Sequence, residues 1–430
     1  MRLAIATAAA LVMVCAPVWA QTEFTTTLAG HVACRPQGVG QVHDRQAHRN
    51  HRKRDGQVVR ASDWCGAAVQ GTTNSGHSGI KIMPDGTYWI ITDNGFGSKA
   101  NSPDSMLYLN RYRIDWAANS WQRFETIFLH DPDKKVPFRI VHESTDKRYL
   151  TGADFDTEGF QWIGETLWIG DEFGPYVIKI DKTGKVLAVF ETIADGKPVR
   201  SPDHYAVSSP GAPAAVYTNV NLRRSKGFEG FASSKDGKFI YGLLEGPLWK
   251  EDTKDWERVD DKEAARILEF DVAAEKFAGR YWLYVFEANG NAIGDFNMVD
   301  DTTGLVIERD NGEGTADKTC PAGQRGEYCF PDIAKFKRVY KVELSDANVG
   351  KPVRKIAYID LMKVRIRTRR RASHSMTACL HSHSSQSRTS TWWTRATSSS
   401  AMTTICRSRP AGSQIRPTTT SSYSLRLPIS

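Results

Sequence analysis

Short apolar runs alternate with turn signals along most of the chain between residues 76 and 364. Their length and their aromatic and β-branched content are typical of strands. The clearest runs are GTYWIITD (86–93), TLWIGDE (166–172), YVIKID (176–181), KVLAVFET (185–192), KFIYGLLE (238–245), RILEFDV (266–272), YWLYVFE (281–287) and RVYKVEL (338–344). Helical periodicity is scarce, and we expect only a short helical turn within residues 260–270, DDKEAARILEF. The pattern predicts an all-β fold.

One unit of strands occurs more than once. It has the sequence TEGFQWIGETLWIGDEFGP from Thr157 and FEGFASSKDGKFIYGLLEGP from Phe228, with a looser copy from His77 and a partial one from Leu305. Both clear copies contain Glu-Gly-Phe, a turn, an apolar strand, a glycine, an acidic residue and a proline. A repeated strand unit that ends in an acidic turn predicts a β-propeller, and we expect about six blades. A double-sheet sandwich is the alternative, but it does not explain the repeated acidic turns.

The repeated turns carry oxygen-bearing side chains, and Glu158 and Glu229 open two of the repeats. If these groups converge, their like charges are unfavourable without a counter-ion. Hard oxygen ligands suit Ca²⁺, or Mg²⁺ with more retained water. We therefore predict a calcium site, whose candidate ligands are Asp93, Asn94, Asp171, Glu245, Asp310 and Asn311. The alternative is that each residue caps its own turn by accepting hydrogen bonds from backbone amides.

The acidic positions are also candidates for catalysis. A bound cation polarises a phosphoryl or acyl oxygen while a carboxylate acts as general base. The candidate catalytic residues are Asp171, Glu172, Glu245, Glu158 and Glu229; the candidate substrate-binding residues are Arg223, Arg224, Lys226 and Arg309, with Lys99 as a further candidate. Arginine suits phosphate because its fork binds two oxygens, although a solvated basic loop is the alternative. The segment GHSGI (76–80) is not a nucleophile elbow, so we expect Ser78 to be structural.

The formal charge of +8 comes from two unusual segments. Residues 34–74 carry a net charge of +4, and residues 365–430 carry eleven arginines and no acid, so the remaining chain has a net charge of −7. If the codons for the second segment are read one base out of register, they can encode IENVDVVDPRHIVVGNDNNLP. This peptide has the same spacing from Glu to Gly as the repeat from Glu229 to Gly242. We interpret both segments as frameshifted and expect a disordered tail and a disrupted last blade. The alternative is a genuine basic loop and basic arm, and we expect no nucleic-acid partner.

The first twenty residues, MRLAIATAAALVMVCAPVWA, have the pattern of a secretory signal peptide. They are too short and wrongly flanked for a membrane span, and we expect a periplasmic or secreted protein whose propeller occupies residues 21–364. Such compartments permit disulfides. Cys320 and Cys329, in CPAGQRGEYC, are therefore expected to pair, and no second close pair of Cys or His accompanies them to suggest zinc.

Several motifs together resemble the bacterial phytase-like family, described as esterase-like activity of phytase. They are GHSGIKIMPDGTYWIITDNGFGSKANSPD (76–104), LTGADFDTEGFQWIGETLWIGDEFGPY (150–176), RSKGFEGFA (224–232) and YGLLEGPL (241–248). The resemblance covers roughly residues 76–361 and implies an exported propeller that hydrolyses phosphate or other small-molecule esters. It implies no assignment of catalytic residues. A non-catalytic propeller that binds a ligand or protein partner is the alternative, and a lactonase-like hydrolase is a related option.

Overall fold

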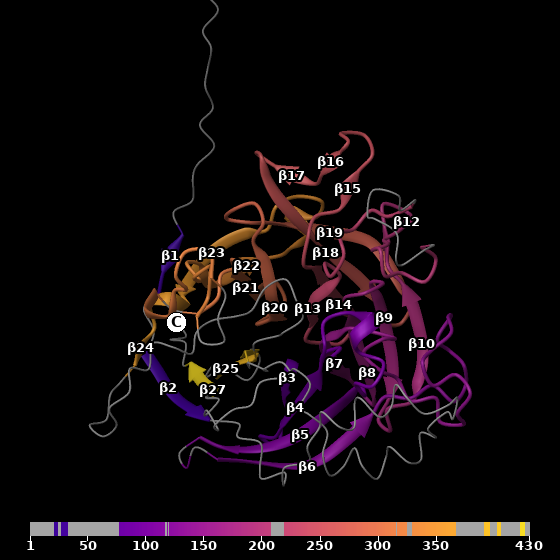
Figure 1. Ribbon diagram of the computed structural model, residues 1–430. Coiled ribbons are helices and arrows are strands. Elements are labelled where there is room, and N and C mark those ends of the chain that lie inside the picture. Colours follow the sequence, from indigo (N-terminus) through magenta and orange to yellow (C-terminus); the bar gives the residue numbers. More distant parts are fainter. Residues whose placement is uncertain are drawn as a thin grey trace, which may run out of the picture.

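The strands of the chain wrap around a single axis as a ring of blades (Figure 1). The structure is a computed structural model of the 430-residue chain. It describes residues 21–24, 27–32, 77–116, 118, 120–207, 219–314, 316–324, 329–366, 391–395, 402–405 and 422–425. Within these ranges the regular elements are β-strands and single 3₁₀ turns. The predicted all-β propeller is therefore confirmed.

Four antiparallel sheets in the described residues form four blades. The first blade contains β3 (His77–Ile82), β4 (Tyr88–Thr92), β5 (Tyr108–Asp115) and β6 (Ser120–Phe128); the second contains β7 (Thr157–Ile163), β8 (Thr166–Asp171), β9 (Tyr176–Asp181) and β10 (Val186–Glu191). The third contains β13 (Phe228–Ser233), β14 (Phe239–Leu244), β18 (Lys262–Asp271) and β19 (Lys276–Val285); the fourth contains β20 (Ala292–Met298), β21 (Thr303–Arg309), β22 (Lys337–Glu343) and β23 (Arg354–Asp360). The inner strands β3, β7, β13 and β20 are neighbours in that order.

Short strands from both ends of the chain lie between the fourth and first blades (Figure 1). They are β2 (Thr27–Val32), β24 (Arg365–Ile366), β25 (Thr391–Arg395), β26 (Met402–Ile405) and β27 (Ser422–Leu425). The pair β25–β26 lies against β3 and β20, and β2 pairs with both β24 and β27. The strand β1 (Thr22–Glu23) adds to β23 in parallel. Segments far apart in the sequence thus lie side by side between these two blades.

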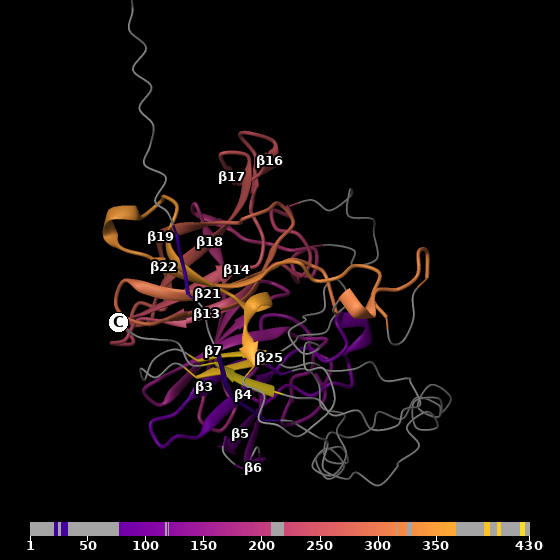
Figure 2. The same cartoon turned by 90° about the vertical axis from the view of Figure 1, so that its left-hand side faces the viewer.

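The remaining short elements lie in the connections. They are η1 (Lys99–Asn101), β11 (Ile193–Ala194), β12 (Lys197–Pro198), β15 (Trp249–Lys250), β16 (Asp255–Trp256), β17 (Arg258–Val259), η3 (Ala316–Lys318), η4 (Asp346–Asn348) and η5 (Leu361–Lys363). Because adjacent strands are antiparallel, the ends of β4, β8, β14 and β21 lie where the inner strands begin. Long connections gather on this side, and Figure 2 shows the helical turns η1 and η3 there together. We call it the loop-bearing face, and loops of this kind commonly carry function.

Contacts between neighbouring inner strands explain the glycine and phenylalanine of the repeat. A Cβ on Gly159 would lie 2.4 Å from the Cβ of Phe231, and a Cβ on Gly230 would lie 2.6 Å from the Cβ of Phe296. Each glycine therefore lies against an aromatic residue of the next blade, and both rings are fully buried. Glycine permits this close approach of two backbones. In both strands the residue before the glycine is a glutamate.

Two detailed expectations have opposite outcomes. The disulfide between Cys320 and Cys329 is confirmed. The short helical turn expected within residues 260–270 is wrong, because this segment belongs to β18, which pairs with β14 on one side and β19 on the other. Pairing on both sides and burial of Ile267 outweigh the helical preference of Glu and Ala in this segment.

Several other expectations concern residues that the structure does not describe. The expected signal peptide (1–20), the segment 34–74 and most of the segment 365–430 lie outside the described residues. Of the last segment, only residues 365–366 and the strands β25, β26 and β27 are described. Among the described residues, no helix is long and apolar enough to cross a membrane.

The glycine contacts predict the effect of a single added methyl group. We expect Gly230→Ala to lower the free energy of unfolding by about 1–3 kcal/mol, the usual cost of overpacking, because the new Cβ would lie 2.6 Å from the Cβ of Phe296, which cannot move without its backbone. Gly294→Ala, on β20, is the matched control, because its Cβ would meet the side chain of Ile307, at 3.2 Å. Urea denaturation of both variants measures the difference, and equal losses would contradict the argument.

Candidate metal centre and active site

Each inner strand carries a β-bulge at the end near the loop-bearing face. The pairing register shifts between His77 and Ile80 in β3, Thr157 and Phe160 in β7, Phe228 and Gly230 in β13, and Ile293 and Asp295 in β20. A bulge breaks the alternation of a strand and changes the direction of its side chains. Glu158 and Glu229 lie in the bulges of β7 and β13, and Ser78 lies in that of β3. The repeated bulge therefore positions glutamates of two neighbouring blades.

A second acidic position recurs at the ends of β8 and β14. Glu172 and Glu245 directly follow the last residues of these strands. The amide of Glu172 donates a hydrogen bond to the carbonyl of Asp156, and that of Glu245 donates to the carbonyl of Gly227, both at 2.8 Å. Gly227 also lies against the neighbouring blade, since a Cβ there would be 2.4 Å from the backbone oxygen of Glu172. The two glutamates therefore occupy equivalent positions of adjacent blades.

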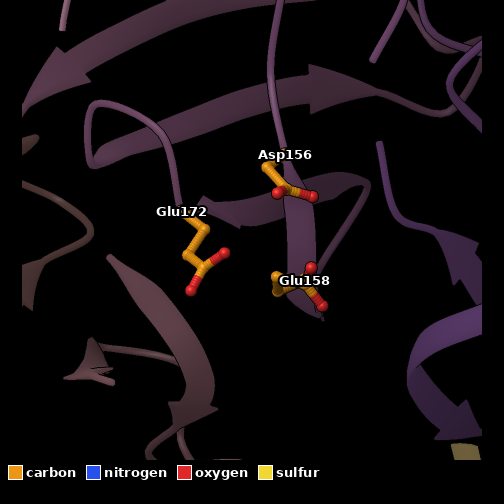
Figure 3. A group of neighbouring side chains, drawn as sticks. All are labelled: Asp156, Glu158 and Glu172. Carbon is orange, nitrogen blue, oxygen red and sulfur yellow. The ribbon is translucent and has the colours of Figure 1, made fainter. Parts of the chain in front are cut away.

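The glutamates and one aspartate form two groups of three carboxylates that share Glu172. One oxygen from each of Asp156, Glu158 and Glu172 lies within 4.8 Å of the others, and the same holds for Glu172, Glu229 and Glu245. Figure 3 shows the first group, in which Glu172 faces Asp156 and Glu158 from the neighbouring strand end. Glu229 is partly exposed, and the other four residues are buried. Both groups could hold a hard cation, which prefers oxygen ligands.

Burial and mutual repulsion raise the pKa values of these carboxyl groups. Burial raises the pKa of Asp156 to about 8, and the charge of Asp93 adds to the rise. Burial also raises the pKa values of Glu158, Glu172 and Glu229 well above the usual range, and neighbouring carboxylates add to each. A nearby divalent cation favours the charged form of such groups and lowers their pKa values again. The proton content of the centre is therefore linked to metal binding.

Asp156 was not among the residues selected from the sequence. Its Oδ2 accepts a hydrogen bond of 2.6 Å from Nδ2 of Asn94, and its Oδ1 accepts one of 3.0 Å from the amide of Asn94. It lies two residues before Glu158, in the stretch DFDTEGF. Alternate residues of an extended chain face the same side. This spacing is the signal in the sequence that points to Asp156.

Asp171 closes a turn. Its Oδ1 accepts a hydrogen bond of 2.8 Å from the amide of Asp156, and its Oδ2 accepts one of 2.7 Å from the amide of Gly174. Asp93 likewise accepts a hydrogen bond of 2.8 Å from the amide of Gly95. These contacts match the turn-capping alternative, while the catalytic and metal-binding roles of Asp171 and the metal-binding role of Asp93 stay predictions.

Of the acidic candidate ligands, Glu245 belongs to one of the two carboxylate groups, whereas Asp93, Asp171 and Asp310 belong to neither. Asp310 Oδ1 accepts a hydrogen bond of 2.9 Å from Nζ of Lys337, and its Oδ2 accepts one of 2.7 Å from the amide of Lys335. Asn311 Nδ2 donates to the carbonyl of Gly290 at 2.9 Å. In the fourth blade, the carboxylate of Asp310 therefore pairs with Lys337 of the same blade.

Two of the candidate substrate-binding residues contact the second carboxylate group. Lys226 Nζ donates a hydrogen bond of 2.6 Å to Oε2 of Glu245, and Arg309 Nη2 donates one of 2.9 Å to Oε1. Arg223 and Arg224 pair instead with carboxylates outside the two groups. Positive charge thus lies beside the second group, at the junction of the third and fourth blades.

The bulge residue of β3 leaves a buried hydroxyl without a partner. Ser78 is 7% exposed, and its Oγ makes no hydrogen bond to any described residue. The preceding His77 bonds to the hydroxyl of Tyr112 through Nε2 at 3.1 Å, and burial lowers its pKa to about 4. His77 is therefore not hydrogen-bonded to Ser78. A buried polar atom without a partner calls for an explanation, such as a water molecule or an ion.

The sequence of the chain matches one known family. Residues 72–375 match the phytase-like family, described as esterase-like activity of phytase, and the chain therefore belongs to it. A bacterial branch of that family stays a prediction. An uncharacterized secreted protein of Arthroderma benhamiae is 32% identical over 129 residues, which are 27% of this chain and 24% of the relative. The match thus spans about a quarter of the relative's length.

Solved structures give weaker likenesses. Hydrazine synthase of Kuenenia stuttgartiensis has a TM-score of 0.28 at 12% identity, over 69% of this chain and 67% of that chain. A putative 6-phosphogluconolactonase of Bacteroides uniformis has a TM-score of 0.26 at 10% identity, over 65% of this chain and 70% of that chain. Values this low support no argument about the function of this chain.

The raised pKa values predict how stability depends on pH when metal is removed. Asp156 has a pKa of about 8 in the folded protein, whereas an unfolded Asp ionises near ~4. Between these values the folded state binds more protons, so the free energy of unfolding falls as pH rises. Urea denaturation in EDTA between pH 5 and pH 8 measures this slope.

We expect Asp156→Asn to reduce the slope, because the amide cannot ionise. Glu165→Gln is the control, because the side chain of Glu165 is 85% exposed and lies in the β7–β8 turn. A wild-type free energy that rises throughout this pH range in EDTA would contradict the account.

Proposed function

We propose that this member of the phytase-like family is an exported hydrolase that cleaves phosphate or other small-molecule esters with the help of calcium. The observation that carries the proposal is the pair of carboxylate groups sharing Glu172. These groups lie beside the bulges of the inner strands, on the loop-bearing face. A buried cluster of ionisable groups with strongly shifted pKa values is typical of a functional site.

The first group is the better candidate for the calcium site. In the described part of the chain, no lysine or arginine forms an ion pair with Asp156, Glu158 or Glu172, whereas Glu245 is paired with two basic side chains. Buried acids without a basic partner are stabilised by a bound cation. Calcium takes about six to eight oxygen ligands, so water would complete the set.

Each carboxylate then has a separate role. Calcium held by Asp156, Glu158 and Glu172 would supply positive charge to polarise the phosphoryl or acyl oxygen of the ester. Glu229 is partly exposed, and no described residue donates a hydrogen bond to its carboxylate, so we assign it as the general base that accepts a proton from the attacking water. Glu172 belongs to both groups and positions the water between them. Addition of water to the ester and departure of the alcohol then yield the acid and the alcohol.

The basic side chains at Glu245 are assigned to the substrate. Lys226 and Arg309 each place a positive charge beside the second carboxylate group. An anionic oxygen of a phosphoester would compete with Glu245 for their N–H groups. Arginine is well suited to this because it presents two parallel donors. This arrangement favours a phosphoester over a neutral ester.

A non-catalytic propeller that binds a ligand is the second candidate. It is favoured by the observation that Asp171 and Glu245, two of the candidate catalytic residues, are held by backbone amides and by basic side chains respectively. Such contacts stabilise charged carboxylates without any reaction. Tight binding of an organic phosphate without turnover would favour this candidate.

We also propose that residues 1–20 direct export and that residues 34–74 and 365–430 result from frameshifts. The disulfide Cys320–Cys329 and the name of the Arthroderma benhamiae relative, an uncharacterized secreted protein, support export. Peptide mass spectrometry of the protein made by its host tests the frames. We expect peptides from the shifted reading of the tail, such as IENVDVVDPR, and peptides from the printed tail would refute the frameshift.

The hydrolase proposal predicts calcium-dependent turnover. We expect the protein to hydrolyse 4-nitrophenyl phosphate or 4-nitrophenyl acetate with added calcium and to lose this activity in EDTA. Glu229→Gln should lower kcat by about 100-fold, the usual contribution of a general base. Glu165→Gln, at an exposed position, should retain full activity. Full turnover in EDTA, or an unchanged kcat in a folded Glu229→Gln variant, would rule out this mechanism.

A further inference from the structure

Most basic side chains near the candidate centre are already neutralised. The carboxylate partners are Glu245 for Lys226 and Arg309, Glu263 for Arg223, and Asp203 for Arg224. An incoming anion must therefore break an existing ion pair to reach any of these four groups. Lys99 differs from them, because its ammonium group forms no ion pair and no hydrogen bond with any described residue.

Two aromatic rings hold Lys99 in place. Its Nζ lies 5.3 Å from the ring centre of Phe173 and 5.4 Å from that of Phe138. Attraction between a cation and a ring face orders the side chain without neutralising its charge. Lys99 is half-buried, so its ammonium group stays within reach of a ligand on the loop-bearing face. The protein thus maintains an ordered positive charge without a carboxylate partner.

The rings around Lys99 continue into an exposed aromatic surface. Phe138 stacks on Tyr205 with ring centres 5.7 Å apart and an angle of 27° between the rings. Tyr205 is 48% exposed, and Val141, three residues after Phe138, is 43% exposed. These are two of the four large apolar side chains that are exposed among the described residues. Flat ligand groups stack favourably on such a surface.

Lys99 also lies close to the carboxylate centre. Phe173, one of its two aromatic contacts, directly follows Glu172. Phe138 packs on Phe155, with ring centres 5.3 Å apart, and Phe155 directly precedes Asp156. The rings that contact Lys99, or pack on its ring contacts, thus belong to residues next in the chain to Glu172 and Asp156.

We propose that Lys99 binds the anionic group of the ligand and that the Phe138–Tyr205 surface binds a flat apolar group attached to it. The ligand class is then an acidic ester with an aromatic or similarly flat alcohol portion. This inference rests on the proposed function, since it names the substrate class of the same site. Lys99 acts as a specificity-determining residue, in addition to Lys226 and Arg309, which are assigned to an anionic oxygen of the same substrate.

Binding of a non-hydrolysable probe tests the proposal separately from turnover. We expect phenylphosphonate to bind the full-length protein in calcium buffer, measured by isothermal titration calorimetry. Lys99→Met keeps the apolar stem between the rings and removes the charge, so the Kd should rise about tenfold, or ~1.4 kcal/mol. Lys238→Met is the matched control, because Lys238 is a solvent-exposed lysine in the β13–β14 turn and should leave the Kd unchanged.

The aromatic surface has its own test. Tyr205→Ser should weaken binding of phenylphosphonate and leave binding of methylphosphonate unchanged, because only the first probe carries a ring. Absence of phenylphosphonate binding to the wild type, or an unchanged Kd in Lys99→Met, would overturn the proposal. If binding depends on Lys99 but no ester is hydrolysed, the hydrolase proposal fails and the ligand assignment stands. If esters are hydrolysed while Lys99→Met binds the probe like the wild type, the ligand assignment fails and the hydrolase proposal stands.

Discussion

Repulsion among five buried or half-buried carboxyl groups is the constraint on which the centre of this propeller depends. The groups belong to Asp156, Glu158, Glu172, Glu229 and Glu245. Their burial favours the neutral form, and each charge on one makes ionisation of the next more costly. The second group is partly neutralised by Lys226 and Arg309, but the first has no basic partner in the described chain. This asymmetry is why we place the cation in the first group.

The rest of the fold holds these charges at close range. Apolar clusters fill the space between neighbouring blades, with Phe160 between the first and second and Phe231 between the second and third. Glycines at the blade contacts allow the inner strands to approach, and bulges direct Glu158 and Glu229 away from the regular alternation of the strands. The energy released by burying apolar surface thus offsets the cost of gathering the acids.

The sequence predicts the propeller because each repeat contains motifs for two structural features of a blade. Glu-Gly-Phe marks the bulged inner strand, and the acidic turn marks the end of the next strand. Sequence motifs alone do not predict the role of a site residue when a contact with a residue distant in sequence decides that role. Asp310 occupies a repeat position, but Lys337, twenty-seven residues later, engages its carboxylate. Asp156 lies just before the repeat, so the repeat does not mark it, and its role follows from its closeness to Glu158 and Glu172 in the fold.

The central claim is that the first carboxylate group binds a divalent cation. The most direct measurement is anomalous diffraction from crystals of the protein soaked in manganese, which replaces calcium at oxygen sites. The account predicts an anomalous peak coordinated by Asp156, Glu158 and Glu172, and its loss in a folded Glu172→Gln variant. A wild-type crystal with no peak at these three residues would contradict it.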